Sequence, residues 1–458
     1  MELMMRPKPP IADVPDDLFR QRLTSIIDAR HRLVLLAARI DWAALETRFA
    51  GRFVSERGRP ALPVRLMVGL HLLGQIKNLS DEAVCAAWVE NPYFQHFCGE
   101  TFFQHTLPAD RSSISRWRLR IKEEDLEVML AATVTMATKS GAVKPGQLER
   151  VTVDTTVATK AVAHPTDSHL MVRAIEHLNA TAEACGVRVR QSYLRVSAHA
   201  RREAARLIHG RGHKQAMAHL RFIRIRLGRL IRDITAKTKP EDRGPGTRLA
   251  TVLERATTIH AQAFGKKPEG GKLYAFHAPE VECIAKGKAR VRYEFGVKAS
   301  FAVTNARCPG GQFVLGAQVR PGLAYDGHTL KDQLAQVTRI TGAQVQRAYV
   351  DRGYRGHGIK EADGPTVYVS HTRGITSSTI KRELRRRNAI EPVLGHMKAY
   401  GRLERQAYAG THGDTYAIMM AAIGHNLRLL LAWLKTFLRA MILTLIANMI
   451  PRSPLSAT

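Results

Sequence analysis

The stretch Val151-Thr-Val-Asp154-Thr-Thr156 decides the fold and supplies the first candidate functional residue. Its β-branched, alternating residues predict a buried strand over 149–159 that carries Asp154. Ala348-Tyr-Val-Asp351-Arg-Gly-Tyr354 has the same form and predicts a strand over 344–351 that ends at Asp351. Further strands are predicted at 290–304, 312–319 and 366–370, with a helix from 326 to about 340. Strands interspersed with helices indicate an α/β fold.

Helical spacing dominates the sequence before the first strand. Residues 16–125 contain apolar positions at helical intervals, with Ser80 as a cap and Ser112 or Ser113 as another. A helical N-terminal domain is predicted at 1–130. Its short helices are compatible with a helix-turn-helix-like DNA reader using Arg116, Arg118 and Arg120, or with a plain bundle that has a solvated basic face.

A helical insertion is predicted at 165–275, directly after the first strand. Leu220, Ile223, Leu227 and Leu230 form one helical stripe. Arginines surround this stripe, at Arg221, Arg224, Arg226, Arg229 and Arg232. They indicate either phosphate contacts along a duplex or a solvated face on a structural helix pair, and the pattern does not separate these alternatives.

The bulk composition indicates a polyanionic partner. The 458 residues suggest two to four domains, and 70 Lys and Arg against 40 Asp and Glu give a net charge of +30. Five scattered cysteines without a Cys-x-x-Cys pair argue against a zinc finger or disulfide framework and favour a reducing cytoplasm.

Neither end of the chain predicts a membrane segment. The Pro-rich residues 7–17 contain no apolar signal core. Residues 427–450 are apolar, but Arg428, Lys435 and Arg439 interrupt them, and the run that follows is too short to span a bilayer. An apolar helix and tail at 431–458 is therefore expected to pack internally or to form an oligomer contact.

A third carboxylate completes the candidate site. Glu391 lies in Asn388-Ala-Ile-Glu391-Pro, within a long basic helix predicted from about residue 378. Each carboxylate alone has an ordinary explanation, as a strand end, a turn residue or a helical ion pair. Together with Asp154 and Asp351, Glu391 fits a magnesium site that acts on phosphodiesters, because carboxylate oxygens are natural Mg²⁺ ligands.

These motifs resemble the DDE-type transposases of bacterial insertion sequences, of the broad group numbered four and five. Val153-Asp154-Thr-Thr156 resembles the first catalytic strand, and Tyr349-Val-Asp351-Arg-Gly-Tyr354 resembles the second. The spacing of Arg387, Glu391 and Lys398 matches the Arg–Glu–Lys part of the group's signature, whereas Leu384 stands where that signature has Tyr. The segments Thr166-Asp167, Tyr325-Asp326-Gly-His328-Thr and Gly424-His425-Asn426-Leu-Arg428 are also similar to the family.

The resemblance implies a ribonuclease H-like mixed sheet at 145–430, interrupted by the insertion. It implies that Asp154, Asp351 and Glu391 bind two Mg²⁺ (or Mn²⁺) ions, and that phosphates are bound by Arg387, Lys398, Arg386 and Arg352. The same site would use water and then a 3′-hydroxyl as attacking groups. The expected partner is double-stranded DNA, at transposon ends and targets, bound by a homodimer in the bacterial cytoplasm at the nucleoid.

Two alternatives to a transposase stay open. A catalytically inactive or domesticated relative would bind DNA through its helical domain and basic surface. A metal-dependent nuclease would keep the carboxylates but would not join strands. The sequence specifies neither the terminal repeats, the target preference nor the choice between cut-and-paste and copying.

Overall fold

The chain divides into two compact units in the computed structural model. The first unit comprises Met1–Thr159 and Lys298–Thr458, and the second comprises Lys160–Val297. The described residues are 20–52, 61–210, 212–265, 268, 271–285, 292–360, 364–372 and 374–449, with side chains described as far as residue 436. The second unit is longer in sequence than the predicted insertion at 165–275. It also contains a strand at Glu282–Ala285 that was not predicted from the sequence.

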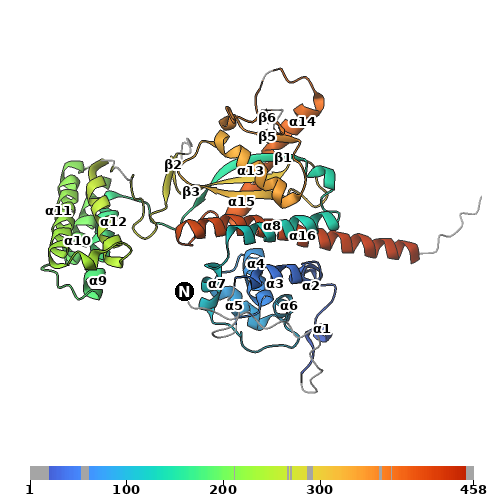
Figure 1. The fold of residues 1–458 in the computed structure, drawn as a ribbon, viewed down its shortest axis with the longest axis horizontal. Helices are drawn as coiled ribbons and strands as arrows, with labels where there is room; N and C mark the ends of the chain where they lie inside the picture. Colours follow the sequence, from blue (N-terminus) through green and yellow to red (C-terminus); the bar gives the residue numbers. More distant parts are fainter. Residues whose placement is uncertain are drawn as a thin grey trace, which may run out of the picture. The chain divides into compact units, whose positions relative to one another are not determined.

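Short helices form the N-terminal part of the first unit, drawn from blue to teal in Figure 1. They are α1 (Leu23–Ile26), α2 (Arg32–Ala37), α3 (Trp42–Ala50), α4 (Val64–Lys77), α5 (Asp81–Glu90), α6 (Pro92–Phe97), α7 (Arg111–Arg118) and α8 (Glu123–Lys139). The Ser80 hydroxyl accepts a hydrogen bond from the Ala83 N–H at the start of α5, as predicted. The predicted cap of α7 is wrong, because the carboxylate of Asp110 precedes both serines and accepts the Ser112 N–H.

A buried polar cluster joins this helical part to the long helix α16 (Gly410–Met449). The Arg118 guanidinium pairs with Asp81 at 2.6 Å and lies 4.9 Å from the centre of the Tyr416 ring. The Tyr416 hydroxyl is 2.7 Å from Nδ1 of His71, whose pKa is lowered to about 3 by burial and by the Arg118 charge. Arg118 is therefore an internal residue, which does not fit the alternative in which it reads DNA.

One mixed sheet organises most of the remainder of the first unit. Its strands are β1 (Arg150–Thr159), β2 (Glu282–Ala285), β3 (Tyr293–Thr304), β4 (Val314–Arg320), β5 (Arg347–Val350) and β6 (Thr366–Val369). Strand β2 and the first residues of β3 belong to the second unit. Their order is β2-β3-β1-β5-β6, with β4 also paired to β3. The β1–β5 and β5–β6 pairs are parallel, whereas β4 is antiparallel to β3. The α/β class is thus confirmed.

Helices α13 (Asp326–Thr341), α14 (Ser378–Arg386) and α15 (Ile390–Tyr400) complete the first unit. The single long helix predicted from residue 378 past Glu391 is wrong, because a 3-10 turn at Arg387–Ala389 separates α14 from α15. Pro392 supplies a physical reason. It has no N–H to donate to the carbonyl of Asn388, and its ring disfavours a regular α-helix across that turn.

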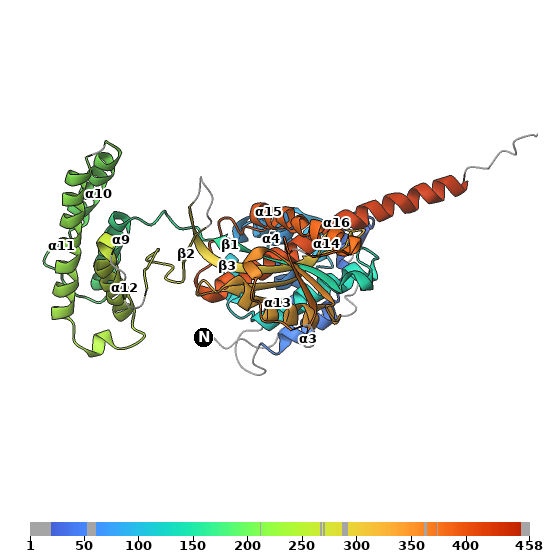
Figure 2. The same ribbon diagram turned by 90° about the horizontal axis from the view of Figure 1, so that it is seen from above.

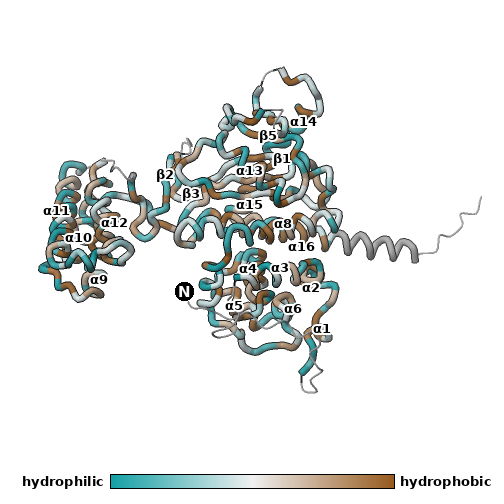
Figure 3. Tube along the Cα trace, in the orientation of Figure 1, coloured by the Kyte–Doolittle hydropathy of each residue, from teal (hydrophilic) through white to brown (hydrophobic). Residues whose placement is uncertain are grey.

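Helix α16 lies beside α8 in the first unit, and hydrophobic residues recur along it (Figure 3). Gly410–Thr436 is long and apolar enough to cross a membrane by composition, but 78% of that apolar window is buried within the protein. Buried residues such as Ile418, Ile423 and Leu427 account for its apolar character. The helix continues without a break through residue 431, where a domain boundary was predicted.

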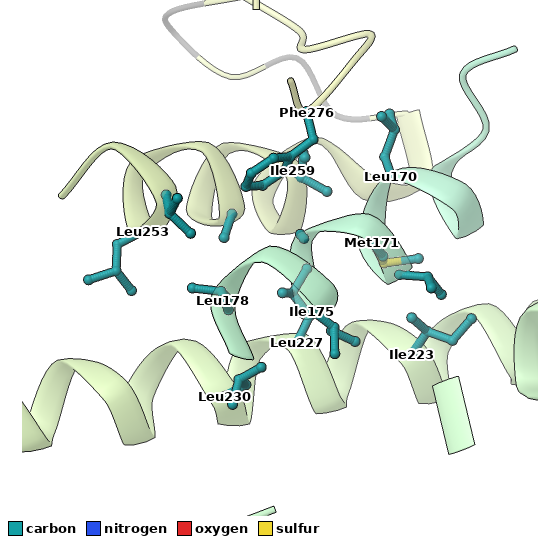
Figure 4. Close-up of a cluster of buried hydrophobic side chains, with 14 of the residues drawn as sticks. Leu170, Met171, Ile175, Leu178, Ile223, Leu227, Leu230, Leu253, Ile259 and Phe276 are labelled. Carbon is teal, nitrogen blue, oxygen red and sulfur yellow. The ribbon is translucent and has the colours of Figure 1, made fainter. Parts of the chain in front are cut away.

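The second unit has its own hydrophobic core. Its helices are α9 (Asp167–Ala184), α10 (Leu194–His209), α11 (His213–Lys237) and α12 (Arg248–Gln262). Figure 4 shows Ile175 of α9, Leu227 of α11 and Ile259 of α12 meeting in this core, together with Phe276. The predicted stripe is confirmed at Ile223, Leu227 and Leu230, which are all buried.

Candidate functional site

The parallel register of β1 and β5 brings two predicted site residues to adjacent positions. Thr152 pairs with Tyr349, and Asp154 and Asp351 each follow two residues later on their respective chains. Side chains two residues apart on a strand project to the same face. The neighbouring strands therefore present both carboxylates on one side of the sheet, at the end where β5 stops.

The pKa of Asp154 is raised above the ordinary value for an aspartate. Burial is the main cause that raises its pKa to about 6, and the negative charges of Asp351 and Asp326 act in the same direction. The Thr155 N–H donates to Oδ1 at 2.8 Å and, like the Arg387 guanidinium, opposes the shift. The Asp154 side chain is 22% exposed, so its carboxylate can still be reached from solvent.

Asp351 is held as an anion by groups that follow β5 and β6. Burial acts to raise its pKa, but hydrogen bonds from the Ser370 hydroxyl and the Arg352 N–H outweigh that effect and lower the pKa overall. Ser370 follows β6, and its hydroxyl donates to Oδ1 of Asp351 at 2.8 Å. Asp154 and Asp351 thus have opposite pKa shifts at neighbouring positions.

A third aspartate lies near this pair, and the sequence analysis assigned no role to it. Oδ1 of Asp326, at the start of α13, accepts hydrogen bonds from the Thr155 hydroxyl and from Nζ of Lys298, each at 3.1 Å. Burial raises the pKa of the Tyr354 hydroxyl, and the negative charges of Asp154 and Asp326 act in the same direction. The family-like segment Tyr325–Thr329 was the only signal pointing to Asp326.

Arg387 is the basic residue that the fold brings to the aspartates. Its guanidinium Nη1 is 3.9 Å from Oδ2 of Asp154, and its charge also lowers the pKa of Asp351. The cation therefore acts on both carboxylates. Arg386 has a different position, since its Nε donates to the carbonyl of Asn305 at 2.7 Å.

The side chains of the remaining predicted residues differ in exposure. Glu391 is exposed in the first turn of α15, and it is not among the groups that act most strongly on the pKa of Asp154 or Asp351. Lys398 is half-buried near the end of the same helix, and Arg352 is exposed directly after Asp351. The structure thus brings together Asp154, Asp351 and Arg387, but not Glu391.

The residue types of the cluster fit a hard divalent cation, although the ligand set is incomplete. Asp154 and Asp351 offer the carboxylate oxygens that Mg²⁺ prefers. Burial is the main cause of the raised pKa of Asp154, and a bound cation would favour its charged form instead. In the described part of the chain, no group of three or more His, Cys, Asp or Glu side chains could hold a metal ion as arranged.

A buried glutamate on α14 supports the strands that carry the aspartates. The Glu383 carboxylate accepts hydrogen bonds from Arg150 Nη1 at 2.8 Å and from the Tyr349 hydroxyl, and it pairs with Arg347 Nε at 3.2 Å. Arg150 belongs to β1, whereas Arg347 and Tyr349 belong to β5. Glu383 therefore fastens both strands to α14, and the sequence analysis did not single it out.

Substituting Ser370→Ala removes the hydroxyl that stabilises the Asp351 carboxylate. We expect a loss of about 1 kcal/mol in the free energy of unfolding at neutral pH, typical for one hydrogen bond. Because the folded-state pKa of Asp351 is lowered, this difference is present above its ordinary pKa of 3.8 and disappears as the pH falls through the folded-state value. Urea unfolding across acid and neutral pH measures it.

Thr372→Ala is the matched control for that variant. Its exposed hydroxyl donates to the Val369 carbonyl, close in sequence to Ser370 but not to a carboxylate. A Thr372→Ala loss should not vary with pH in the range where Asp351 titrates. An equal pH dependence in both variants would show that the Ser370–Asp351 bond is not its source.

Comparisons with known proteins place the chain in a class. A family model described as a transposase domain (DUF772) matches residues 21–120. The uncharacterised protein ORF8 from the nfe locus of Rhizobium meliloti is 49% identical over 207 residues, which are 45% of this chain and 99% of that protein. No solved structure matches the chain.

A transposase domain defines a class of DNA-modifying enzymes, and this chain carries that domain. The chain belongs more specifically to the insertion-sequence transposase family, as a relative of the Rhizobium ORF8 protein. The matched domain covers the N-terminal helices and precedes the sheet, so it does not include Asp154, Asp351 or Arg387.

Proposed function

We propose that this protein is a DDE-type transposase with a ribonuclease H-like catalytic domain, which binds insertion-sequence ends and catalyses strand cleavage and strand transfer. The observation that carries the proposal is the register that aligns Asp154 with Asp351 on adjacent parallel strands. The mixed sheet, in which β1, β5 and β6 are parallel and β4 is antiparallel to β3, also supports it. A transposase domain precedes this sheet in the same chain.

In this proposal the chain's residues form a site for phosphodiester chemistry. Asp154 and Asp351 would hold two Mg²⁺ (or Mn²⁺) ions, and Glu391 would be the third carboxylate after a movement of the turn before α15. The ions, when bound, activate the attacking oxygen and stabilise the leaving oxygen. Arg387 releases Asp154 and contacts a phosphate oxygen next to the scissile bond, for which its planar guanidinium is suited.

The proposed partner is double-stranded DNA, at transposon ends and at the target. The net charge of +30 supports this, because neutralising phosphates with Lys and Arg drives association with nucleic acid. In this proposal Lys398, Arg386 and Arg352 also contact DNA phosphates. Two protomers on paired ends are the proposed assembly, and the side chains of the candidate contact at 437–458 lie outside the described residues.

A DNA-binding protein without cleavage activity is the second candidate. The position of Glu391 favours it, since that side chain is exposed and separate from the two aspartates. A protein that only bound DNA would have no use for a completed carboxylate triad. The two candidates therefore differ in whether Glu391 joins the site when metal and DNA are present.

The deciding experiment uses the full-length protein, Mg²⁺ and DNA that carries the element's own ends. A transposase releases a 3′-hydroxyl at the end and then gives products joined to target DNA. Binding without cleavage would overturn the proposal in favour of the DNA-binding protein. Cleavage without joining would instead identify a metal-dependent nuclease.

Arg387→Gln should slow end cleavage by on the order of 10- to 100-fold, as expected for loss of a charge-stabilising donor at a reacting phosphate. Removing the guanidinium also raises the pKa of Asp154 further, because Arg387 now lowers it. Single-turnover cleavage at several pH values measures both effects. Arg385→Gln, an exposed neighbour on α14, is the control, and equal losses in both variants would remove the special role of Arg387.

A further inference from the structure

Half of the chain's excess positive charge lies in the second unit. Residues 160–297 contain 27 Lys and Arg against 12 Asp and Glu, a net charge of +15 out of +30. Residues 194–237, which span α10 and α11, contain 12 basic residues and only 2 acidic ones. The core of the unit is apolar and does not require this charge. The concentration on one helix pair therefore calls for a separate explanation.

Helix α10 has one cationic edge. Arg195, His199, Arg202 and Arg206 recur at intervals of three and four residues, so they share one side of the helix, and all four are exposed. The opposite side contains the small buried residues Ser197, Ala200 and Ala204. Small residues allow α10 to pack closely along α11, and the two helices lie side by side in Figures 1 and 2.

The cationic edge borders a groove between the two helices. The groove has a volume of about 850 Å³ and is lined by Arg195, His199 and Arg202 of α10 and by His219 and Phe222 of α11. The guanidinium of Arg226 lies 3.5 Å from the centre of the Phe222 ring. This cation covers the aromatic face, so the ring is not open for a nucleic-acid base to stack on it.

The two carboxylates of this helix pair neutralise only one residue of the edge, Arg206. Glu203 pairs with Arg206 at 2.7 Å, and Asp233 pairs with Lys237 at 2.9 Å. Within the described part of the chain, Arg195 and Arg202 have no ion-pair partner. Two guanidinium groups are thus left facing solvent at the groove without a protein anion.

We propose that the groove between α10 and α11 binds the phosphate backbone of duplex DNA, which makes the second unit a DNA-binding module. From Arg195 to Arg206 the helix rises about 16 Å, enough to follow several successive phosphates. A second copy of this chain does not fit the same face, because that contact would place like charges together. The covered Phe222 ring disfavours a single strand, whose binding relies on base stacking.

This inference rests on the proposed function only for the identity of the polyanion as DNA. Exposed arginines on a helix contact phosphates without reading bases, so the module should bind any sequence. It would add affinity for DNA outside the element's ends, without a role in end recognition or in the chemistry at Asp154.

The test measures binding of the full-length protein to a short duplex that lacks the element's ends, without metal, over a series of salt concentrations. The variant carries Arg195→Gln, Arg202→Gln and Arg206→Gln together. Each lost phosphate contact reduces the slope of log affinity against log salt by about 0.9, so we expect a reduction of roughly 2 to 3. A weakening on the order of 10- to 100-fold at low salt should accompany it.

The control carries Arg173→Gln, Arg188→Gln and Arg248→Gln, three exposed arginines of the same unit away from the groove. It loses the same net charge, and its salt slope should stay that of the unchanged protein. Equal losses in the two triple variants, or none in either, would overturn the proposal. Tighter binding of a single strand, abolished by Phe222→Ala, would replace duplex DNA with single-stranded nucleic acid and would also overturn it.

The outcome is independent of catalysis because neither metal nor element ends are present. A changed slope in a protein that cannot cleave DNA would leave the groove assignment standing and remove the proposed chemistry. An unchanged slope in a protein that cleaves and joins DNA would overturn the groove assignment and leave the proposed chemistry standing. Circular dichroism of both triple variants checks that the exposed substitutions leave the helices folded.

Discussion

Protein carrying Asp351→Asn should bind DNA with the element's ends as the unchanged protein does, but should neither nick nor join it. The carboxamide has nearly the shape of the carboxylate and can still accept the Ser370 hydrogen bond, so the fold is retained. It lacks the negative charge that a divalent cation requires. We expect end cleavage to fall by on the order of 10³-fold or more, as for loss of a central catalytic group.

Gel-based cleavage and joining assays, with binding measured in parallel, separate this result from a loss of affinity. Asp154→Asn should behave in the same way, because its carboxylate is the register partner of Asp351. Asp332→Asn is the control, since Asp332 is an exposed carboxylate on α13 that pairs with Arg320. Full activity of either active-site variant would exclude the aspartate pair as the centre of the reaction.

Glu391→Gln belongs to the same series and tests the proposed ligand that lies in α15, outside the sheet. If the turn before α15 carries Glu391 to the aspartates, the loss should be as large as for Asp351→Asn. Wild-type activity of Glu391→Gln would show that another group completes the site. Asp326 is the nearest alternative carboxylate, because its charge already acts on Asp154.

Replacing Glu383 with Ala should have the largest effect on stability. The side chain is 4% exposed and holds Arg150, Arg347 and Tyr349, so its loss leaves two cations and a hydroxyl without their acceptor. Breaking a buried pair costs about 3 kcal/mol, the lower end of the usual range, because both arginines keep some contact with water. Chemical denaturation of the metal-free protein measures the change.

The pH dependence identifies the carboxylate as the source of this stability. Burial acts to raise the pKa of Glu383, but the bonds from Tyr349 and Arg150 outweigh it and lower the pKa below its ordinary 4.5. The stabilisation is therefore present above pH 4.5 and is lost as the pH falls through the folded-state pKa. Glu383→Gln should lose less free energy of unfolding at neutral pH than Glu383→Ala. Its free energy of unfolding should also fall less steeply than that of the unchanged protein as the pH becomes acid.

Glu404→Ala, at a solvent-exposed carboxylate in the turn before α16, provides the comparison. It should change the free energy of unfolding by less than about 0.5 kcal/mol, as is usual for surface positions. A similarly small change for Glu383→Ala would mean that α14 is not fastened to the strands in this way. Cleavage by refolded Glu383→Gln would then report separately on the alignment of the aspartates.

Local patterns predicted the strands well because their residues are buried on both faces. Val151 and Thr152 on one strand, and Ala348 and Tyr349 on the other, are almost fully buried, and such uninterrupted β-branched or apolar runs are a strong strand signal. The short strand β2 carries no such run, so nothing in its sequence distinguished it from a loop. The break before α15 followed from Pro392, whose effect the long basic pattern concealed.

The candidate site could be predicted only in part, since its contacts join distant parts of the chain. Asp154 and Asp351 were found because each ends or interrupts an apolar run. Asp326 and Glu383 were not assigned, because their significance lies in partners that the sequence does not place beside them: Lys298 for the first and Arg150 for the second. The exposed position of Glu391 likewise depends on the turn geometry.

The pairing of β1 with β3 makes the segment between these strands replaceable by protein engineering. The Asn305 N–H donates to the Arg150 carbonyl at one end of the pair, and the Lys160 N–H donates to the Phe295 carbonyl at the other end. The two strands therefore run antiparallel. The part of the chain from 161 to 292, which contains the four helices of the second unit, is thus a single excursion between neighbouring strands. Excising it and closing the gap with a tight turn would leave a smaller, contiguous scaffold, and a foreign domain with closely spaced termini could take its place.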